Sequence, residues 1–431
     1  MRRVKLINIG CKVNFAETST LKTKLQEKGF VITDKYSDAE IVLINTCTVT
    51  NNADADCRAA IRRAKRETNG AFVGVFGCFA QLYYEQLAEM PEVNAVYGIK
   101  EKFLIPELLQ THFQKSTKSI EVSELTSLSF DFAYSADNAA RSRCFLKIQD
   151  GCNYRCSYCT IPNARGNPRS IPFEQLPEIF NEVAEKGFRE IVLSGINLGE
   201  YNSNNFYDFE DVLQLIAEND FGVRFRISSI EPNLINDKII DYVCNSDTIC
   251  KHLHIPLQSG SDKILKLMRR RYTSDKLFND IHKIKSINSD VCIGLDVITG
   301  FPGETEQDFK QTYDFIDNLP ASYLHVFTYS ERKNTPAANF PDKVPMKTRK
   351  ERTHSLKQLS HSKLLAFYQT QIGKIHEFLP EKYSESEKIH LGHTSNYLHC
   401  KVITEKGLDN SFFYVQINEI DKDDKIIATL K

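Results

Sequence analysis

The chain has 431 residues, of which 41% are hydrophobic and 26% charged, and its formal net charge is −1. This length exceeds one ordinary core and predicts about two to four domains, with the composition of a typical globular protein. The near-zero charge excludes a global electrostatic argument for nucleic-acid binding, so any such function must rest on local patches.

No apolar run is long enough to cross a membrane, and we expect no membrane association. The basic start of the chain leads into an apolar run that Lys5, Asn8 and Lys12 interrupt, which indicates a first β-strand rather than a signal peptide. Twelve cysteines without an export signal indicate a reducing compartment, where metal binding or catalysis outranks disulfides. We therefore expect a cytoplasmic protein.

The first 113 residues alternate between expected strands and helices, which predicts a parallel α/β domain. The strands are expected at 4–9, 41–45 and 72–76, with helices such as 17–28 and 53–67 between them. Such a sheet is flavodoxin-like or half of a Rossmann unit. No G-x-G-x-x-G sequence is present, so a dinucleotide is not indicated.

Three cysteines follow the three expected strands: Cys11, Cys47 and Cys78. Ligands of open α/β sheets gather at the carboxyl ends of the strands, so these thiols can converge on one point although they are far apart in sequence. The alternative is three separately buried thiols. Cys57 lies within an expected helix and is more simply a packing or surface thiol.

Residues 114–141 are rich in serine and threonine and show little periodicity, which predicts a linker with room for one short strand. From 142 to 371 the alternation resumes, with six strands expected at 145–149, 190–193, 224–228, 252–256, 292–298 and 323–327. Helices such as 172–186 and 305–319 separate them. Six strand–helix units predict a partial TIM barrel, whose site lies at the C-terminal ends of the strands.

The loop after the first barrel strand contains Cys152, Cys156 and Cys159 in C-x3-C-x2-C spacing. Thiolates suit Fe–S clusters and zinc, and three ligands without a nearby fourth leave one metal position open, as catalytic metal sites do. The alternatives are a zinc knuckle with a distant fourth ligand, or three buried thiols. The spacing resembles that of the radical S-adenosylmethionine (SAM) enzymes, which implies a 4Fe-4S cluster whose unique iron chelates SAM.

Polar, glycine-containing loops follow the other barrel strands, and we interpret them as SAM contacts. They supply Ser194, Gly195, Asn197, Ser229, Glu231 and Gln258. Glycine lets the backbone approach a ligand closely, and Glu231 can accept hydrogen bonds from ribose hydroxyls. Tyr158, within the cysteine loop, packs against adenine or in the core. Each of these residues alone is weak evidence, because polar turns are common at strand ends. The interpretation depends on the order in which the loops follow one another around the barrel.

After an expected long amphipathic helix at 346–372, strands are expected at 375–379, 399–404, 412–417 and 425–430. They predict a small OB-like β-barrel, a type that often binds nucleic acid. Residues 372–431 contain eight Lys, no Arg and ten Asp plus Glu, an acidic balance that is unexpected for an RNA-binding barrel.

Basic residues are grouped locally. Arg58, Arg62 and Arg66 recur every four positions on one expected helix, and basic runs occur at 269–271 and 347–352. Such stripes neutralise phosphates, although a solvated helix face is the alternative. The candidates for phosphate or substrate-carboxylate contacts, to which arginine's bidentate fork is suited, are Arg58, Arg62, Arg165 and Arg332.

Several motifs carry a resemblance to a known family: Gly10-Cys11-Lys12-Val13-Asn14, Asn45-Thr46-Cys47-Thr48-Val49, Gly77-Cys78, residues 151–166, and Gly392-His393-Thr394-Ser395-Asn396-Tyr397. Over nearly its whole length the chain resembles the radical-SAM methylthiotransferases. The resemblance implies a methylthiotransferase domain (1–113), a radical-SAM core (142–371) and a TRAM domain (372–431), which is an RNA-binding β-barrel. It also implies a second, auxiliary 4Fe-4S cluster with one open iron, held by Cys11, Cys47 and Cys78.

Two branches of this family modify adenosine next to the tRNA anticodon, carrying an N6-isopentenyl or an N6-threonylcarbamoyl group. The third modifies an aspartate of a small-subunit ribosomal protein. Residues 11–14 and 151–166 most resemble the threonylcarbamoyl branch, which implies 2-methylthiolation of N6-threonylcarbamoyladenosine at tRNA position 37. One SAM then yields a 5′-deoxyadenosyl radical at the first cluster, and a second SAM methylates a sulfur on the open auxiliary iron.

The resemblance further implies a tRNA anticodon loop and an electron donor such as flavodoxin or ferredoxin as partners, and leaves the sulfur donor open. Methylthiolation of isopentenyladenosine or of the ribosomal-protein aspartate are the alternatives, and the acidic C-terminal segment favours the latter. A non-enzymatic Fe–S protein that binds RNA is a third alternative, against which the open three-cysteine spacing argues.

Overall fold

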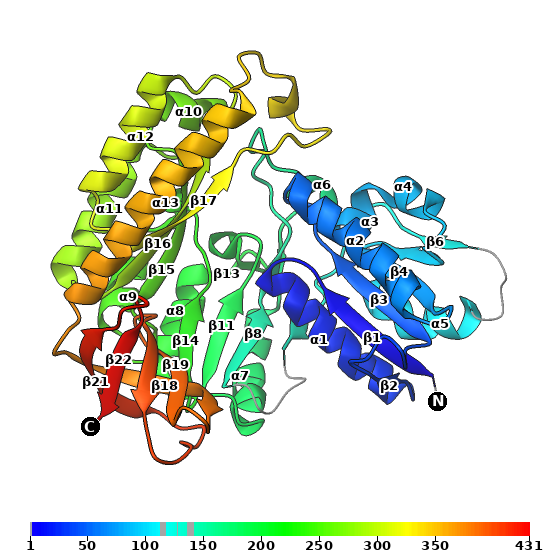
Figure 1. Ribbon diagram of the computed structural model, residues 1–431, viewed down its shortest axis with the longest axis horizontal. Coiled ribbons are helices and arrows are strands. Elements are labelled where there is room, and N and C mark those ends of the chain that lie inside the picture. Colours follow the sequence, from blue (N-terminus) through cyan, green and yellow to red (C-terminus); the bar gives the residue numbers. More distant parts are fainter. Residues whose placement is uncertain (1, 113–117, 127, 136–141) are drawn as a thin grey trace.

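The computed structural model describes residues 2–112, 118–126, 128–135 and 142–431. Figure 1 shows three bodies: an N-terminal α/β body, a central partial barrel and a small C-terminal barrel. No helix in the described ranges is long and apolar enough to cross a membrane.

The N-terminal body is built on a six-stranded parallel sheet in the order β2-β1-β3-β4-β5-β6. The strands are β1 (Arg3–Asn8), β2 (Val31–Ile32), β3 (Ile41–Thr46), β4 (Phe72–Gly77), β5 (Ala95–Tyr97) and β6 (Ser119–Glu121). Its first five strands have the flavodoxin-like order, one of the two alternatives that the sequence left open. All six residues of β3 are buried, because helices cover both faces of the sheet.

Two groups of helices cover this sheet. One face packs against α1 (Lys12–Glu27) and α5 (Ile105–His112), which follows η1 (Lys102–Leu104). The other packs against α2 (Asn51–Glu67), α3 (Cys78–Leu82) and α4 (Tyr84–Glu89). Helix α1 begins at Lys12, five residues before the expected start, because Val13 and Ala16 are already buried against the body. Its first turn therefore lies directly beside Cys11.

The central body has six parallel strands in sequence order, which confirms the predicted partial barrel. They are β8 (Arg143–Lys147), β11 (Glu190–Ser194), β14 (Arg224–Ile227), β15 (His252–Gln258), β16 (Cys292–Thr299) and β17 (Tyr323–Thr328). The ladder is interrupted between β14 and β15, where one isolated parallel bridge joins Phe225 to Ile249. One large hydrophobic core fills the space between these strands and the outer helices.

The remaining elements of the central body connect or cover these strands. The helices are α6 (Ile161–Arg165), α7 (Leu176–Glu185), α8 (Phe209–Glu218), α9 (Asp237–Asn245), α10 (Asp262–Leu267), α11 (Ser274–Ile287), α12 (Glu306–Asn318) and α13 (Met346–Gln369). The short 3-10 helices are η2 (Phe173–Gln175), η3 (Leu198–Glu200), η4 (Pro232–Leu234) and η5 (Pro336–Asn339). The short strands are β7 (Ala133–Tyr134), β9 (Gln149–Asp150), β10 (Arg169–Ser170), β12 (Asn202–Ser203) and β13 (Tyr207–Asp208).

The expected linker at 114–141 contributes to both neighbouring bodies. Strand β6 extends the first sheet beside β5, and β7 pairs antiparallel with β8. Residues 114–117, 127 and 136–141 of this stretch lie outside the described residues.

The C-terminal body is a closed five-stranded barrel in the order β18-β19-β20-β22-β21. Its strands are β18 (Ile375–Ser384), β19 (Ile389–Thr394), β20 (His399–Ile403), β21 (Phe413–Ile420) and β22 (Ile426–Leu430). The sequence pattern missed β19, because its inward residues are His390, Gly392 and Thr394 rather than large apolar ones. A Cβ on Gly392 would lie 2.2 Å from the Leu379 carbonyl oxygen, so glycine permits the close crossing of β18.

The small barrel docks on the N-terminal ends of the central strands. Arg224 donates to Glu377 at 3.0 Å and to the His393 carbonyl at 2.9 Å, while Arg226 donates to the Thr394 carbonyl at 3.2 Å. Both arginines also bind the fully buried Glu190, at 2.8 and 2.7 Å. The small barrel therefore lies at the opposite end of these strands from their carboxyl termini (Figure 1).

Candidate active site

The structure brings Cys11, Cys47 and Cys78 together where β1, β3 and β4 end. Cys11 is exposed at the N-cap of α1, whereas Cys47 and Cys78 are buried. Burial, the neighbouring Cys78 thiol and that of Cys11 raise the pKa of Cys47 to about 12. A Cβ on Gly10 would lie 2.9 Å from the Cys47 Cβ, so glycine is required for this close approach. Three thiols at one sheet edge are a donor set that suits an iron–sulfur cluster.

The second cysteine loop follows β9 and is irregular from Gly151 to Cys159. Gly151 has φ +75°, and a Cβ there would lie 2.1 Å from the Asn167 carbonyl oxygen. The Cys159 amide donates to the Cys156 carbonyl at 3.1 Å, which turns the chain between these two cysteines. Burial and the nearby Cys156 thiol raise the pKa of Cys159 to about 12. This loop also supplies three thiols for one cluster.

Arg270 reaches the second cysteine loop from the segment after α10. Its guanidinium donates to the Cys156 sulfur at 3.3 Å and to Glu231. Arg270 therefore pairs with one carboxylate oxygen of Glu231, the residue that is expected to accept hydrogen bonds from ribose hydroxyls. Sequence reasoning placed Arg270 only in a basic run, because its proximity to Cys156 arises across 114 residues.

The other expected SAM contacts lie around the C-terminal ends of β11, β14 and β15. Both amide atoms of Asn197 and the Oε1 of Gln258 are buried without a hydrogen-bond partner among the described residues. Ser194 donates to the Val192 carbonyl at 3.1 Å, and Ser229 is half-buried. Because buried polar groups are normally satisfied, the orphaned amides fit a polar ligand such as SAM.

Gly195 and Tyr158 complete the set of expected contacts. A Cβ on Gly195 would lie 2.9 Å from Leu198 and 3.0 Å from the Gln149 Oε1, so the loop is closely packed there. The Tyr158 ring packs edge-on against Phe301 at 6.4 Å. Burial raises the pKa of Tyr158 well above its usual value. Tyr158 thus packs against the buried cluster that contains Phe301.

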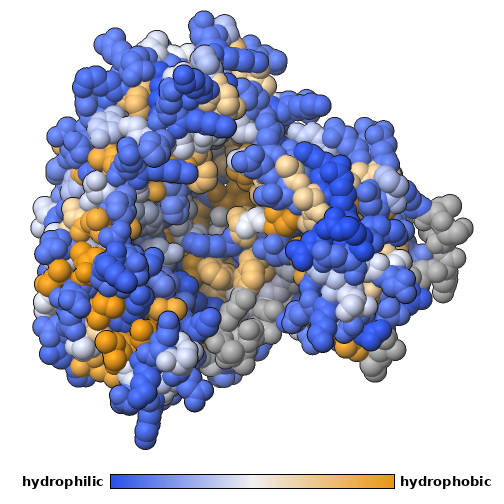
Figure 2. All heavy atoms as spheres, in the orientation of Figure 1, coloured by the Kyte–Doolittle hydropathy of each residue, from blue (hydrophilic) through white to orange (hydrophobic). Residues whose placement is uncertain are grey.

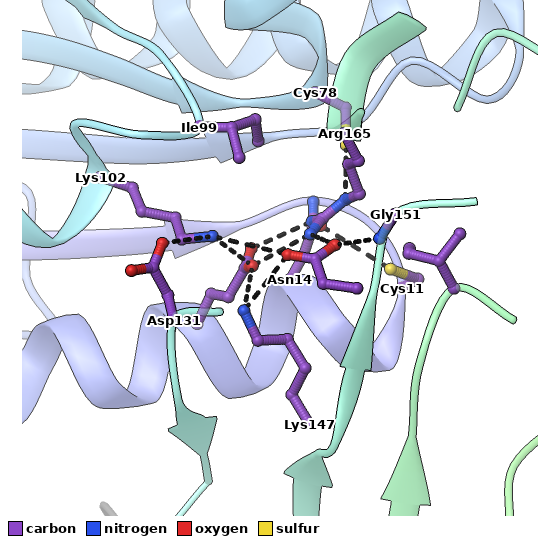
Figure 3. A network of polar contacts seen from close by, with 12 residues as sticks. Cys11, Asn14, Cys78, Ile99, Lys102, Asp131, Lys147, Gly151 and Arg165 are labelled. Atoms are coloured by element: carbon purple, nitrogen blue, oxygen red, sulfur yellow. Dashed lines mark hydrogen bonds and ion pairs between the residues drawn. The ribbon is translucent and has the colours of Figure 1, made fainter. Parts of the chain in front are cut away.

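Arg165 lies on α6, directly after the second cysteine loop, contacts Cys78 of the first cysteine site and is fully buried. Its guanidinium donates to the Cys78 sulfur at 3.2 Å, to Asn14 at 2.7 Å, to both Glu17 oxygens at 3.0 Å and to Asp150 at 2.9 Å (Figure 3). All five of its N–H groups are therefore engaged. This corrects the expectation of a phosphate or substrate-carboxylate contact, because no donor remains for a ligand.

Arg165 belongs to a buried charged network between α1 and the central strands. Glu17 accepts from Lys102 at 2.7 Å and from Lys147 at 3.2 Å, and Asp150 pairs with Arg169 at 2.7 Å. Burial acts to raise the pKa values of Glu17 and Asp150. The charges of Arg165 and the lysines outweigh burial and hold both pKa values well below their usual range. The network fixes the N-terminal body against the barrel.

Arg332 also serves the contact between the bodies. It is 2% exposed and pairs with Asp54 at 2.7 Å, with Asn51 at 2.8 Å and with Thr48. This again differs from the expected substrate contact, because its partners on α2 and in the Cys47 loop were not visible from spacing.

The two remaining arginine candidates are accessible. The Arg58 guanidinium lies 5.8 Å from the centre of the Phe79 ring and is half-exposed, and Arg62 is exposed on the same helix. Both remain available to phosphate groups.

Two further features were not found from the sequence. His254 and His325 contact Asp296 at 2.8 and 3.5 Å, and despite burial these contacts lower the pKa of Asp296 to about 2. Lys12, the first residue of α1, is exposed, and the charges of Arg226, Glu190 and Asp296 act on its ammonium. Figure 2 shows the molecule hollowed between the N-terminal body and the barrel, with hydrophobic residues on the floor of the hollow.

The fold and the cysteine loop define the class. Residues 146–316 match the family model of the Radical SAM superfamily, and residues 3–98 match that of Uncharacterized protein family UPF0004. The fold is similar to that of the radical S-adenosylmethionine methyltransferase TsrM from Kitasatospora setae, with a TM-score of 0.58 at 15% identity, covering 78% of this chain and 77% of that one. The protein is therefore a radical SAM enzyme, a class that uses a 4Fe-4S cluster and SAM.

Relatives define the family within this class. The chain is 37% identical over 407 residues to the threonylcarbamoyladenosine tRNA methylthiotransferase MtaB of Bacillus subtilis, covering 92% of this chain and 90% of the relative. It is 33% identical over 436 residues to the tRNA-2-methylthio-N(6)-dimethylallyladenosine synthase of Fusobacterium nucleatum, covering 97% and 98%. The chain belongs to the radical-SAM methylthiotransferase family. These relatives confirm the family that the sequence motifs indicated.

Proposed function

We propose that this enzyme inserts a methylthio group at C2 of N6-threonylcarbamoyladenosine at position 37 of tRNA, using two SAM molecules and two 4Fe-4S clusters. The observation that carries the proposal is the presence of two three-thiol sites on neighbouring bodies, with Arg165, on the helix that follows the second cysteine loop, contacting Cys78 of the first site. The target carbon bears an unactivated aromatic hydrogen, so bound clusters and SAM supply the radical and methylthio chemistry that side chains lack.

The six cysteines have the role of ligands in this proposal. Cys152, Cys156 and Cys159 hold the cluster that binds SAM, and Cys11, Cys47 and Cys78 hold the auxiliary cluster. Arg270 and Arg165 donate N–H groups to one sulfur of each set, at 3.3 and 3.2 Å. Such hydrogen bonds stabilise thiolate charge and orient the ligands.

The loops at the strand ends hold SAM. Asn197 and Gln258 direct unsatisfied amide groups into the site, and Gly195 and Ser229 lie on the adjoining loops. Tyr158 and Glu231 border the cysteine loop, where Arg270 neutralises the Glu231 carboxylate. These residues orient the cofactor relative to the base and exclude water from it.

The RNA is held by charges and by the small barrel. Arg58 and Arg62 present guanidinium groups on α2 for phosphates, and the base leaves its stack to enter the hollow, which costs little in an anticodon loop. Greater identity to the threonylcarbamoyladenosine relative supports this substrate over the dimethylallyladenosine one. The acidic balance of residues 372–431 favours the ribosomal-protein aspartate as the second candidate. An electron donor such as flavodoxin or ferredoxin completes the system.

Nucleoside mass spectrometry tests the proposal. The measurement compares tRNA from cells that lack other methylthiotransferases, with and without this protein. We expect a new species in which threonylcarbamoyladenosine has one hydrogen replaced by methylthio. If isopentenyladenosine gains the methylthio group instead, the proposed reaction stands, but the assignment of threonylcarbamoyladenosine as the substrate is wrong. No nucleoside change in iron-replete, expressing cells would transfer the proposal to the ribosomal-protein substrate.

A further inference from the structure

Lys12 presents an unpaired positive charge between the two bodies. It is the first residue of α1, follows Cys11 directly and is exposed. It forms no hydrogen bond or ion pair through its side chain with any residue in the described part of the chain. The N-terminal end of α1 lies beside the central strands, at the hollow between the N-terminal body and the barrel (Figures 1 and 2).

The barrel residues that Lys12 faces leave it without a counter-ion. Two cations, Arg226 and Arg143, act on its ammonium, and so do the carboxylates of Glu190 and Asp296. Glu190 is already paired with Arg224 and Arg226 at 2.8 and 2.7 Å. Asp296 is already paired with His254 at 2.8 Å and lies 3.5 Å from His325. The positive charge of Lys12 is therefore left for a ligand.

Three other cations at the contacts between the bodies are engaged, whereas Arg58 and Arg62 on α2 remain accessible. Arg165 uses all its donors within the charged network, and Arg332 binds Asp54 and Asn51. Arg143 is paired with Glu381 at 3.0 Å. Unlike Arg143, Arg165 and Arg332, Lys12 has no hydrogen-bond or ion-pair partner among the described residues.

We propose that Lys12 binds the carboxylate of the threonylcarbamoyl group and thereby selects this nucleoside over those with an uncharged N6 substituent. The proposal rests on the proposed function. An ammonium–carboxylate hydrogen bond is among the strong ones, whereas an isopentenyl group leaves the ammonium desolvated and unpaired. Because Lys12 adjoins Cys11, anchoring the N6 substituent there holds the base beside the auxiliary cysteine site.

Binding of anticodon stem–loops to the reconstituted protein tests this role. The probes carry at residue 37 threonylcarbamoyladenosine, its carboxyl methyl ester, isopentenyladenosine or unmodified adenosine. We expect wild type to bind the acid more tightly than the ester or the isopentenyl form, by roughly tenfold or more for one charged hydrogen bond. Lys12→Met should lose this preference, and Lys12→Arg should retain most of it.

The matched control is Lys35→Met, which removes an exposed lysine at the amino end of the first sheet and should keep the full preference. Retention of the preference in Lys12→Met, or equal binding of acid and ester by wild type, overturns the role of Lys12 and leaves the proposed function standing. Preference of wild type for the isopentenyl probe overturns the proposed function itself. Weaker SAM binding by Lys12→Met without RNA would assign the lysine to the SAM carboxylate and also overturn the inference.

Discussion

Replacing Arg165 with methionine tests the account of how the two cysteine sites are held together. The side chain is fully buried and makes five hydrogen bonds, to Glu17, Asp150, Asn14 and Cys78. Its removal leaves two buried carboxylates short of their main partner. Breaking a buried ion pair in this way typically costs about 3–5 kcal/mol.

The expected loss of stability for Arg165→Met lies at the lower end of that range, because other cations remain beside both carboxylates. Lys102 stays 2.7 Å from Glu17, and Arg169 stays 2.7 Å from Asp150. We therefore expect the free energy of unfolding to fall by about 3 kcal/mol at neutral pH. Urea unfolding of the metal-free, reduced protein measures this, with hydrogen exchange of the α1 amides as a local probe. Arg62→Met removes an exposed arginine and should change the free energy by less than about 0.5 kcal/mol.

The pH dependence of this variant has a defined sign. The depressed pKa values of Glu17 and Asp150 stabilise the fold above the unfolded carboxyl pKa of about 4, and this stability is lost as the pH falls through the folded values. Without Arg165 the pKa values of Glu17 and Asp150 in the folded protein rise, so these carboxyl groups become protonated at a higher pH than in wild type. The difference in the free energy of unfolding between wild type and variant should stay constant above about pH 5 and narrow as the pH is lowered from about 5 to about 3. A difference that is absent at neutral pH, or that stays constant from about pH 5 to about pH 3, would refute the reasoning.

Three further predictions concern the cluster, cofactor and docking residues. Cys156→Ala should abolish SAM cleavage to 5′-deoxyadenosine after anaerobic reconstitution, whereas Cys47→Ala should spare cleavage and block methylthio transfer; equal loss in both assays would contradict separate roles of the two sites. Asn197→Ala should weaken SAM binding by roughly tenfold, as for one polar contact, because its amide atoms have no other partner among the described residues; unchanged affinity in equilibrium dialysis would show that they face elsewhere. Arg332→Met should lower the free energy of unfolding by about 2–3 kcal/mol, because Asp54 loses its partner; a change below about 0.5 kcal/mol would contradict the docking role.

The architecture was predictable because local patterns encode it. Strands β8, β11 and β14 to β17 lie within two residues of their expected bounds, since short stretches that contain apolar residues and alternate with helical segments mark the strands of such a barrel. The loop with Cys152 was equally visible, because its ligands are adjacent in sequence. Strand β19 was missed, since its inward positions carry small or polar residues and its pairing is decided by the closed barrel.

The sequence by itself determined the three-body architecture, the two sets of cysteines and the family to which they belong. Only the tertiary structure decided what the charged residues do. Arg165 and Arg332 are of a residue type that often binds anionic ligands. In the structure, each forms ion pairs with carboxylates from distant segments of the chain. Lys12, which the sequence placed only within the family motif at 10–14, is left unpaired because its neighbours are already neutralised. Charge pairing depends on distances between elements, and these distances exist only after the chain has folded.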